Sequence, residues 1–356
     1  MEFLRRNALR LLLVFAPVAL VLEFFAPERH TTIFITAALS IVPLAGFIGE
    51  ATEELAHRFG PGIGGFLNAT FGNAAELIIG TLALRHGLFD LVKASITGSI
   101  IGNVLLVFGA AAFWGGLGVE TQRFNRVAAS AGTTMLLLSA IGLVVPAVFH
   151  QLVRRTPDAP ELQLDTEIAV VLFITYLASL VFTLRTHRHL YGGPAEHGGA
   201  PRSARRPVVR LLVATTAVAI MSELLVGAVN EAAETLGMTH LFVGVIVVAL
   251  VGNAAEHYSA VVLAGRHQMD AAIAIAVGSS IQIALFVAPV LVFLSYAIAP
   301  RPMDLLFTTF EVVAVALSVL TIAFIAHDGE THWMEGVQLL AVYIILGLAF
   351  FFLPGA

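Results

Sequence analysis

The chain has 356 residues, of which 58% are hydrophobic and 12% charged, and its mean hydropathy is +0.91. This composition is far more apolar than that of a soluble domain, so we expect a membrane protein in contact with the lipid bilayer and no nucleic-acid partner. Cysteine is absent, which excludes disulfides, thiolate metal sites and cysteine nucleophiles. The formal net charge of -5 carries little information, because carboxyl groups inside a bilayer need not be ionised.

Apolar runs long enough to cross about 30 Å of hydrocarbon as a helix recur along the whole chain. Backbone groups in lipid must bond internally, so we predict helices rather than strands. Basic residues precede the first run, as in a signal peptide, but no small-residue cleavage site is evident and we predict a retained helix. The eleven predicted helices cover residues 9–26, 33–52, 64–84, 92–117, 127–149, 166–184, 208–230, 240–263, 271–297, 304–326 and 334–353.

The distribution of Lys and Arg predicts the orientation of these helices, because both residues favour cytoplasmic loops. With the N-terminus inside, 13 of the 19 basic residues fall on the cytoplasmic side and 6 on the other. We therefore predict a cytoplasmic N-terminus and a C-terminus outside.

The long polar connection at residues 186–207 is rich in Gly, Pro, Arg and His, as flexible surface loops are. It separates two sets of five predicted helices and leaves the first helix over. We predict an extra N-terminal helix at 1–30, a first half at 31–185, a cytoplasmic linker at 186–207 and a second half at 208–356.

The two halves carry the same motif, GNAAE, at residues 72–76 and 252–256. With no gap, 12 of 38 positions are identical between 72–109 and 252–289, including an Asp and a Gly-Ser pair at fixed offsets. The two copies lie five predicted helices apart, so they cross the membrane in opposite directions. We therefore predict an all-α polytopic membrane protein with one extra helix and a 5+5 inverted repeat, an arrangement in which secondary transporters bind ions near the midplane.

The polar residues of the two motifs form a candidate cation site. Glu76 follows Asn73, and Glu256 follows Asn253, by three residues, so each Asn–Glu pair shares a helix face. The glycine that precedes each Asn permits a break in the helix. Carboxylate, amide and carbonyl oxygens suit a hard divalent cation such as Ca²⁺. A lone Asn in a span is often helix-helix glue, but an acidic residue there is costly and is a functional candidate.

Without a metal, two neighbouring carboxyl groups shielded from water favour protonation. Glu76 and Glu256 can therefore hold one Ca²⁺ or protons but not both, which is the basis of an exchange mechanism. Two protons per Ca²⁺ would be electroneutral, and an electrogenic ratio needs a third titrating group. His257, beside Glu256, and Glu311 are the candidates; a histidine bonded to a nearby carbonyl is the alternative for His257.

The helices that follow the motifs supply further polar side chains. Asn103 and Gln282 lie one position out of step under the 180-residue offset, and Ser99 and Ser279 lie one turn away. Each can be an ion ligand or can hold two helices together. Zinc-protease and nucleophile-elbow motifs are absent, so we expect no enzyme and no cofactor.

The stretches FGNAAELIIGTLALRHGLFDLVKASITGSIIGNVLLVFG and VGNAAEHYSAVVLAGRHQMDAAIAIAVGSSIQIALF resemble the signature repeats of the cation/proton exchanger branch of the calcium/cation antiporter superfamily. The resemblance implies eleven helices and export of cytosolic Ca²⁺ against inward H⁺. It implies that Glu76 and Glu256 form the shared ion site. Other positions that match the family motifs are Asn73, Asn253, His257 and Gln282.

We therefore predict a Ca²⁺/H⁺ antiporter that works by alternating access, with Ca²⁺ and H⁺ as transported ions. The alternatives are a Na⁺/Ca²⁺ exchanger and a passive cation channel. Sodium/calcium exchangers carry hydroxyl residues ahead of the motif glutamate, where this chain has alanine pairs. The linker at 186–207 is short and basic, which favours a bacterial plasma membrane over an organelle. The sequence indicates no oligomeric state.

Overall fold

The computed structural model describes residues 9–153, 160–187 and 204–353, without the side chains of 60–63, 65 and 69. These residues are helical apart from their connections and a pair of short antiparallel strands, β1 (Gln122–Arg123) and β2 (Glu330–Thr331). The chain divides into two compact units. The first unit consists of the described parts of Met1–Leu82, Leu177–Met238 and Val251–Ala255, and the second of those of Ala83–Tyr176, Thr239–Leu250 and Glu256–Ala356.

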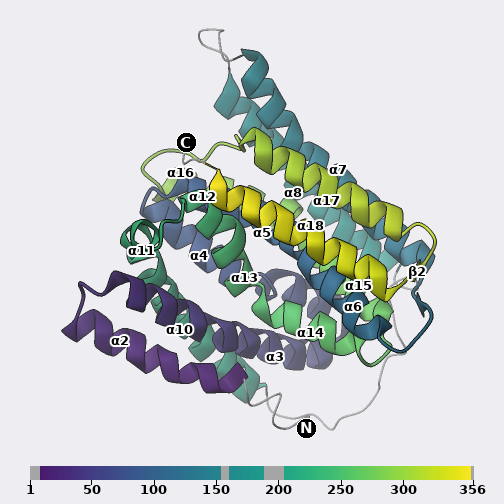
Figure 1. Ribbon diagram of the computed structural model, residues 1–356, viewed down its shortest axis with the longest axis horizontal. Helices are drawn as coiled ribbons and strands as arrows, with labels where there is room; N and C mark the ends of the chain where they lie inside the picture. Colours follow the sequence, from purple (N-terminus) through teal and green to yellow (C-terminus); the bar gives the residue numbers. More distant parts are fainter. Residues whose placement is uncertain (1–8, 154–159, 188–203, 354–356) are drawn as a thin grey trace. The chain divides into compact units, whose positions relative to one another are not determined.

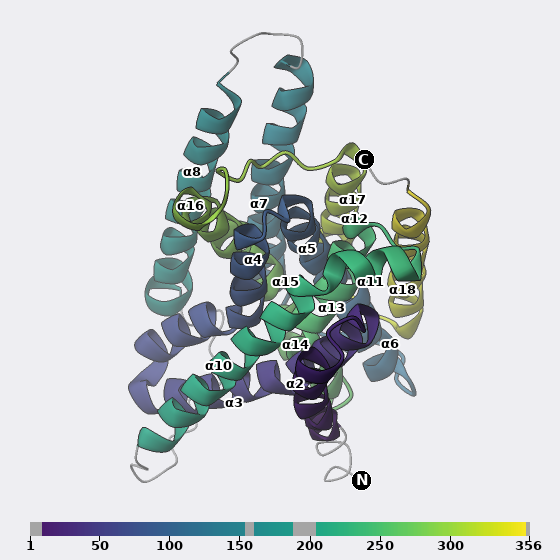
Figure 2. The same cartoon turned by 90° about the vertical axis from the view of Figure 1, so that its left-hand side faces the viewer.

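The first unit is built around one long helix, α3 (His30–Phe71). Helices α2, α10 and α11 pack against α3, and Figures 1 and 2 show α2 and α10 running beside it. Arg10 donates to Glu50 of α3 at 2.9 Å, which ties the N-terminal segment to this helix. The other elements of this unit are η1 (Leu12–Val14), α2 (Phe15–Phe25), η3 (Phe182–Thr186), α10 (Arg205–Gly227) and α11 (Val229–Leu236).

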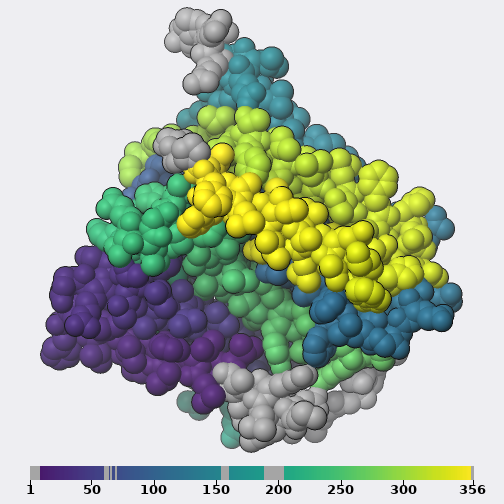
Figure 3. All heavy atoms as spheres, in the orientation of Figure 1, coloured from purple at the N-terminus to yellow at the C-terminus, as the bar shows by residue number. Residues whose placement is uncertain are grey.

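The second unit has α5 (Phe89–Ile101) at its centre, and 83% of the apolar span that begins with this helix is buried. Helix α5 packs against η4, α15 and α17. Helix α18 lies at the surface beside α17, and its apolar residues suit contact with lipid (Figure 3). The other elements wholly in this unit are η2 (Gly102–Val107), α6 (Phe108–Gly116), α7 (Arg126–Val153), α12 (His240–Phe242), η4 (Val243–Val248), α15 (Met269–Gln282), η5 (Ile283–Val287), α16 (Ala288–Ile298), α17 (Thr309–Ile325) and α18 (Trp333–Phe352).

Four helices run from one unit into the other along the chain: α4 (Ala74–Arg85), α8 (Glu161–Val181), α13 (Ala249–Gly252) and α14 (Ala254–Ala264). The units therefore differ from the two sequence halves, since each unit takes helices from both. Helix α10 begins at Arg205, inside the range assigned to the linker, because Pro207 is tolerated in a first helical turn. Residues 188–203 of the predicted linker lie outside the described residues.

Contacts between connections of the second unit occur in two groups. Strands β1 and β2 bring the connections 117–125 and 326–332 together, and Asn125 N–H donates to Asp270 at the start of α15. In the other group, Lys93 at the start of α5 binds Asp304 in the connection before α17.

The described residues contain seven helices long and apolar enough to cross a membrane, or eight if the bent pair Val229–Leu236 and His240–Gly252 is one span. All eleven predicted segments overlap helices, and the count of eleven spans stays a prediction. The seven are His30–Phe59, Phe89–Gly116, Arg126–Val153, Glu161–Thr186, Arg205–Gly227, Met269–Ile298 and Trp333–Phe352.

The predicted helix ends are wrong in two places. The helices predicted at 33–52 and 64–84 are not separated at 53–63, because α3 runs without interruption from His30 to Phe71. The helix predicted at 304–326 begins only at Thr309, and residues 299–308 are not helical. Thr308 is the N-cap, because its hydroxyl accepts from Glu311 N–H at 3.2 Å while Glu311 accepts from Thr308 N–H at 2.9 Å. Upstream, Asp304 accepts from Leu306 N–H at 3.1 Å, a local bond that competes with helix formation.

Candidate functional site

Both GNAAE motifs interrupt a helix, as their glycines predict. Helix α3 ends at Phe71 and α4 begins at Ala74, while α13 ends at Gly252 and α14 begins at Ala254. The two asparagines at the interruptions, Asn73 and Asn253, are each 1% exposed. An amide at this depth brings polar oxygen and nitrogen atoms into the apolar interior, where carbonyl groups freed from the helix can also face an ion.

The first unit brings the two motifs into contact with each other. The carboxyl group of Glu76 lies against the backbone of Gly252: a Cβ atom built on that glycine would lie 3.4 Å from Glu76 Oε1. Asn253 follows Gly252 in the same unit. The glycine of the second motif therefore leaves room for the carboxylate of the first, and this unit holds Glu76, Asn73 and Asn253 of the predicted ligands.

The second unit holds the other motif carboxylate, Glu256, which lies near the start of α14. Ser279 of α15 donates its hydroxyl to Glu256 Oε2. Beside it, His257 Nε2 lies 3.2 Å from Asn103 Oδ1 of η2, within hydrogen-bonding distance. Ser279 and Asn103, predicted from their positions in the following helices, thus bind the Glu256–His257 pair. Three elements fix this group, so its side chains are held by packing as well as by hydrogen bonds.

Each of the two helices that follow the motifs is interrupted by a π-helical segment. Helix α5 continues into η2 and α15 into η5, and π-helical turns occur often at functional sites. Helix α15 is 14 residues long and α5 is 13, so under the 180-residue offset η5 begins one residue later than η2. Asn103 lies inside η2, whereas Gln282 is the last residue of α15, just before η5. Ser99 of α5 is buried.

Glu311, a predicted proton-coupling residue, is buried and has both carboxylate oxygens engaged. Oε1 accepts from the Thr97 hydroxyl at 2.8 Å, and Oε2 accepts from Thr308 N–H at 2.9 Å. The first bond joins α17 to α5 and the second closes the capping box of α17. These contacts give Glu311 a structural role; its part in proton coupling stays a prediction.

The oxygen atoms around the motif carboxylates are of the types that a hard cation accepts as ligands. The described residues contain no group of three or more His, Asp or Glu side chains that could hold a metal ion. The sets found are one carboxylate with amide oxygens in the first unit, and one carboxylate with hydroxyl and amide oxygens in the second. Ca²⁺ accepts mixed oxygen ligands in flexible geometry, whereas Zn²⁺ prefers nitrogen and sulfur.

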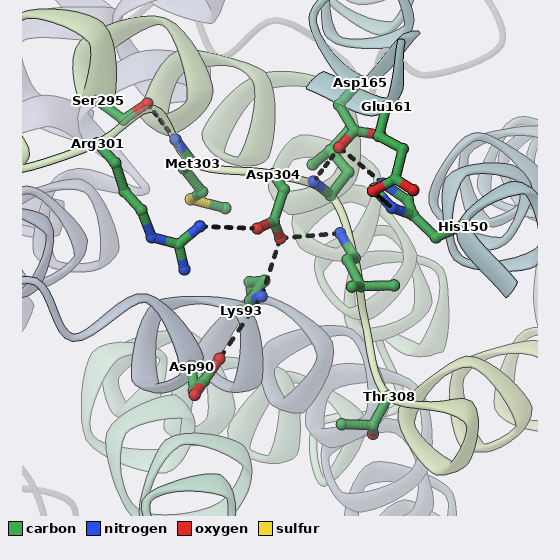
Figure 4. A network of polar contacts seen from close by, with 12 residues as sticks. Asp90, Lys93, His150, Glu161, Asp165, Ser295, Arg301, Met303, Asp304 and Thr308 are labelled. Atoms are coloured by element: carbon green, nitrogen blue, oxygen red, sulfur yellow. Dashed lines mark hydrogen bonds and ion pairs between the residues drawn. The ribbon is translucent and has the colours of Figure 1, made fainter. Parts of the chain in front are cut away.

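The sequence analysis missed a charged network in the second unit (Figure 4). Lys93 Nζ lies 2.9 Å from Asp304 and 3.5 Å from Asp90, and Arg301 lies 3.4 Å from Asp304. Burial raises the pKa of Asp304, but the Lys93 ammonium, the Leu306 N–H and Arg301 outweigh burial and hold the pKa of this carboxyl below its usual range. The sequence signal for this network was Lys93, because a lysine at the start of an apolar helix indicates an acidic partner nearby.

Comparison with known proteins identifies the family. The model of the sodium/calcium exchanger protein family matches residues 29–185 and 207–352. The chain belongs to this family. It is 46% identical to the Ca²⁺/H⁺ antiporter of Synechocystis sp. over 361 aligned residues, with 96% of each chain covered. It is 44% identical to the Ca²⁺/H⁺ antiporter ChaA of Bacillus subtilis, with 90% of this chain and 92% of the relative covered.

Solved structures of exchangers have the same fold. Native YfkE matches with a TM-score of 0.84 and 39% identity, covering 97% of this chain and 100% of that one. The H⁺/Ca²⁺ exchanger CAX matches with a TM-score of 0.73 at 16% identity, which shows likeness of fold alone. These matches confirm the resemblance to the calcium/cation antiporters that the two motif repeats indicate.

Proposed function

We propose that this exchanger-family protein is a secondary transporter that exchanges Ca²⁺ for H⁺ across a membrane. The observation that carries the proposal is full-length similarity, at 44–46% identity, to chains named Ca²⁺/H⁺ antiporters. The paired motifs agree with it, because each unit carries one motif carboxylate among oxygen donors. The relatives are transporters, which favours a transporter over an enzyme.

In the proposed mechanism, Glu76 and Glu256 are the groups that bind either Ca²⁺ or protons. Asn73, Asn253, Asn103, Gln282, Ser99 and Ser279 are the proposed additional oxygen ligands. Competition for the same carboxylates couples the two ions, since neutralisation by protons removes the charge that attracts the metal. Export of Ca²⁺ follows when the loaded carrier opens to the outside and protons from that side displace the metal. His257 and Glu311 stay candidates for a further proton.

The proposed architecture is eleven spans, one extra helix followed by a 5+5 inverted repeat. Helix positions support the repeat: α4 and α14 begin 180 residues apart, as do α5 and α15, and α6 and α16. The excess of basic residues supports a cytoplasmic N-terminus and a C-terminus outside. We propose the bacterial plasma membrane as its location.

Na⁺/Ca²⁺ exchange is less well supported. The alanine pairs before Glu76 and Glu256 place no hydroxyl oxygens ahead of the carboxylates. The similarity to structures of the sodium-calcium exchanger NCX_Mj, at 17–19% identity and TM-scores of 0.53–0.56, shows the fold alone.

The test is ⁴⁵Ca²⁺ uptake into proteoliposomes under an imposed pH gradient in sodium-free buffer. The parent protein should take up Ca²⁺ until a protonophore collapses the gradient, and Glu76→Gln and Glu256→Gln should abolish uptake. Glu53→Gln, a change at an exposed carboxylate of α3, is the matched control and should transport normally. Uptake that requires sodium would contradict proton exchange. Proton-driven uptake that survives Glu76→Gln would contradict the site.

A further inference from the structure

His150 lies between two carboxyl groups at neighbouring ends of α7 and α8 (Figure 4). His150 Nδ1 is 2.7 Å from Glu161 Oε2, and His150 Nε2 is 3.1 Å from Asp165 Oδ2. The side chains of His150 and Asp165 are 6% and 0% exposed, while that of Glu161 is 38% exposed. These three residues, here called the triad, are therefore closed off from their surroundings except through Glu161.

Counting hydrogen atoms shows what the triad binds. A carboxylate only accepts hydrogen bonds, and a neutral imidazole has one N–H to donate, whichever nitrogen carries it. A neutral His150 therefore satisfies one carboxylate and directs a nitrogen lone pair at the other. Both contacts become hydrogen bonds only when the triad takes up one further proton, on the imidazole or on a carboxyl group. Asp165 Oδ1 is buried with no hydrogen-bond donor among the described residues, so part of this carboxylate's charge is uncompensated without that proton.

The triad is joined directly to the non-helical connection 299–308. Asp165 Oδ2, the oxygen that faces His150, also accepts from Leu305 N–H at 3.0 Å. The connection ends at Thr308, the N-cap of α17, and the capping Glu311 binds Thr97 of α5. One oxygen atom thus links the protonation of the triad to a chain of contacts that reaches the central helix of this unit.

We propose that the triad is a proton-binding site whose proton loosens the attachment of the connection 299–308 to α8. Loss of the proton leaves the imidazole with a single N–H for two carboxylates, so the uncompensated negative charge at Asp165 grows and its hydrogen bond from Leu305 N–H strengthens. The predicted orientation puts 299–308 outside, on the side from which protons enter. The triad then makes the exchange rate depend on the outer pH; this last step rests on the proposed function, whereas the proton binding does not.

Other groups near the triad are engaged by their own partners. Lys93 and Arg301 bind Asp304, whose pKa lies below its usual range because these cations outweigh its burial, so this carboxylate stays ionised while the triad titrates. Nearby titratable groups on the surrounding elements have partners of their own: Glu167 on α8 is bound to Gln163, Tyr296 on α16 to Thr166, and Glu311 on α17 to Thr97 and Thr308. Helix α8 also carries the buried Tyr176, while Arg126 and Asp270 lie at the other end of α7.

Glu161→Gln tests whether the extra proton is needed, because this variant can form both contacts of His150 without it. The glutamine amide can donate to His150 Nδ1 while a neutral imidazole donates its Nε2–H to Asp165, so both contacts form without the extra proton. Because the chain has no cysteine, a single thiol introduced at Leu306, 39% exposed in the connection, can carry a nitroxide spin label. His240→Gln, at an exposed histidine of α12, is the matched control.

We expect the mobile fraction of the label to fall roughly five-fold in one titration step as the pH increases, because a hydrogen bond to a charged acceptor is about twice as strong as one to a neutral acceptor. The label is followed from about pH 5 to pH 8, the range in which histidine side chains generally change charge. The step should persist in His240→Gln and disappear in Glu161→Gln. An unchanged step in Glu161→Gln, or no step in the parent protein, would overturn the proposal.

The melting temperature of the unlabelled proteins gives a second readout that does not depend on the label. If the triad binds a proton in the folded protein, the melting temperature of the parent should depend on pH through the same step, and that of Glu161→Gln should not. A label titration without proton-driven Ca²⁺ uptake would support the triad and overturn the proposed function. Proton-driven uptake with the same pH profile in the parent and in Glu161→Gln would overturn the coupling of the triad to exchange.

Discussion

Gly98→Ala should strongly destabilise the protein, whereas the same change at the repeat-equivalent Gly278 should be tolerated. Gly98 of α5 faces the backbone of η4: a Cβ atom there would overlap Val245 O and would lie 2.5 Å from Val245 Cα. Ordinary carbon contacts begin about 1 Å farther out, so α5 and η4 must separate. A Cβ atom on Gly278 meets no atom within 4 Å.

Overpacking of a close interior contact costs about 1–3 kcal/mol, and a clash with backbone that cannot rotate away belongs at the upper end. Alanine in a helix is favoured over glycine by about 1 kcal/mol, which should leave Gly278→Ala neutral or slightly stabilising. The two variants should therefore differ by roughly 3–4 kcal/mol. Thermal unfolding of both, purified in the same detergent, measures this difference. Equal melting temperatures would refute the close approach of α5 and η4.

Two further predictions concern groups that bind a carboxylate. Ser279→Ala removes the hydroxyl that donates to Glu256 and should lower ⁴⁵Ca²⁺ uptake at least ten-fold, since a hydrogen bond to a charged group contributes about 1.5–3 kcal/mol. The control is Ser280→Ala, which changes a neighbouring hydroxyl bonded to a backbone carbonyl and should transport normally. Equal losses of uptake in the two variants would contradict a specific role of Ser279 at Glu256. Because Lys93 holds the pKa of Asp304 below its unfolded value of about 3.9, the stability from this pair is complete above that pH and is lost as the pH falls through the lower, folded pKa. Asp304→Asn should flatten this acid limb of the melting profile, and an unchanged limb would show that Asp304 does not cause it.

The sequence predicted the elements that repetition and apolar length determine. GNAAE predicted the helix interruptions that the structure has at Asn73 and Asn253, because a glycine beside a buried amide weakens the helix at a fixed point. Ser279 and Asn103 were predicted from their offsets along the following helices, and both bind the Glu256–His257 pair. These features are local in sequence or related by the repeat, so a comparison of the chain with itself reveals them.

Contacts between distant segments were not predictable in the same way. Residues 304–308 were read as the start of a helix because DLLFTTF is largely apolar, yet Asp304 binds Lys93, more than two hundred residues earlier. Glu311 was considered only as a proton carrier, and its bond to Thr97 was not foreseen. Hydropathy reports whether a segment suits lipid, but it does not report which polar group a distant helix places opposite it.

The two motifs are alike in sequence but differ in the groups that support them. The residue after the first motif glutamate is Leu77, and the residue after the second is His257, which lies within hydrogen-bonding distance of Asn103 from the first half of the chain. Gly98 and Gly278 occupy equivalent positions, yet only the first is closely approached by another backbone. The repeated motif supplies one carboxylate in each copy, while the residues around the two carboxylates differ. The effects of equivalent substitutions in the two halves should therefore be unequal, and the comparison of Gly98→Ala with Gly278→Ala tests this asymmetry away from the carboxylates themselves.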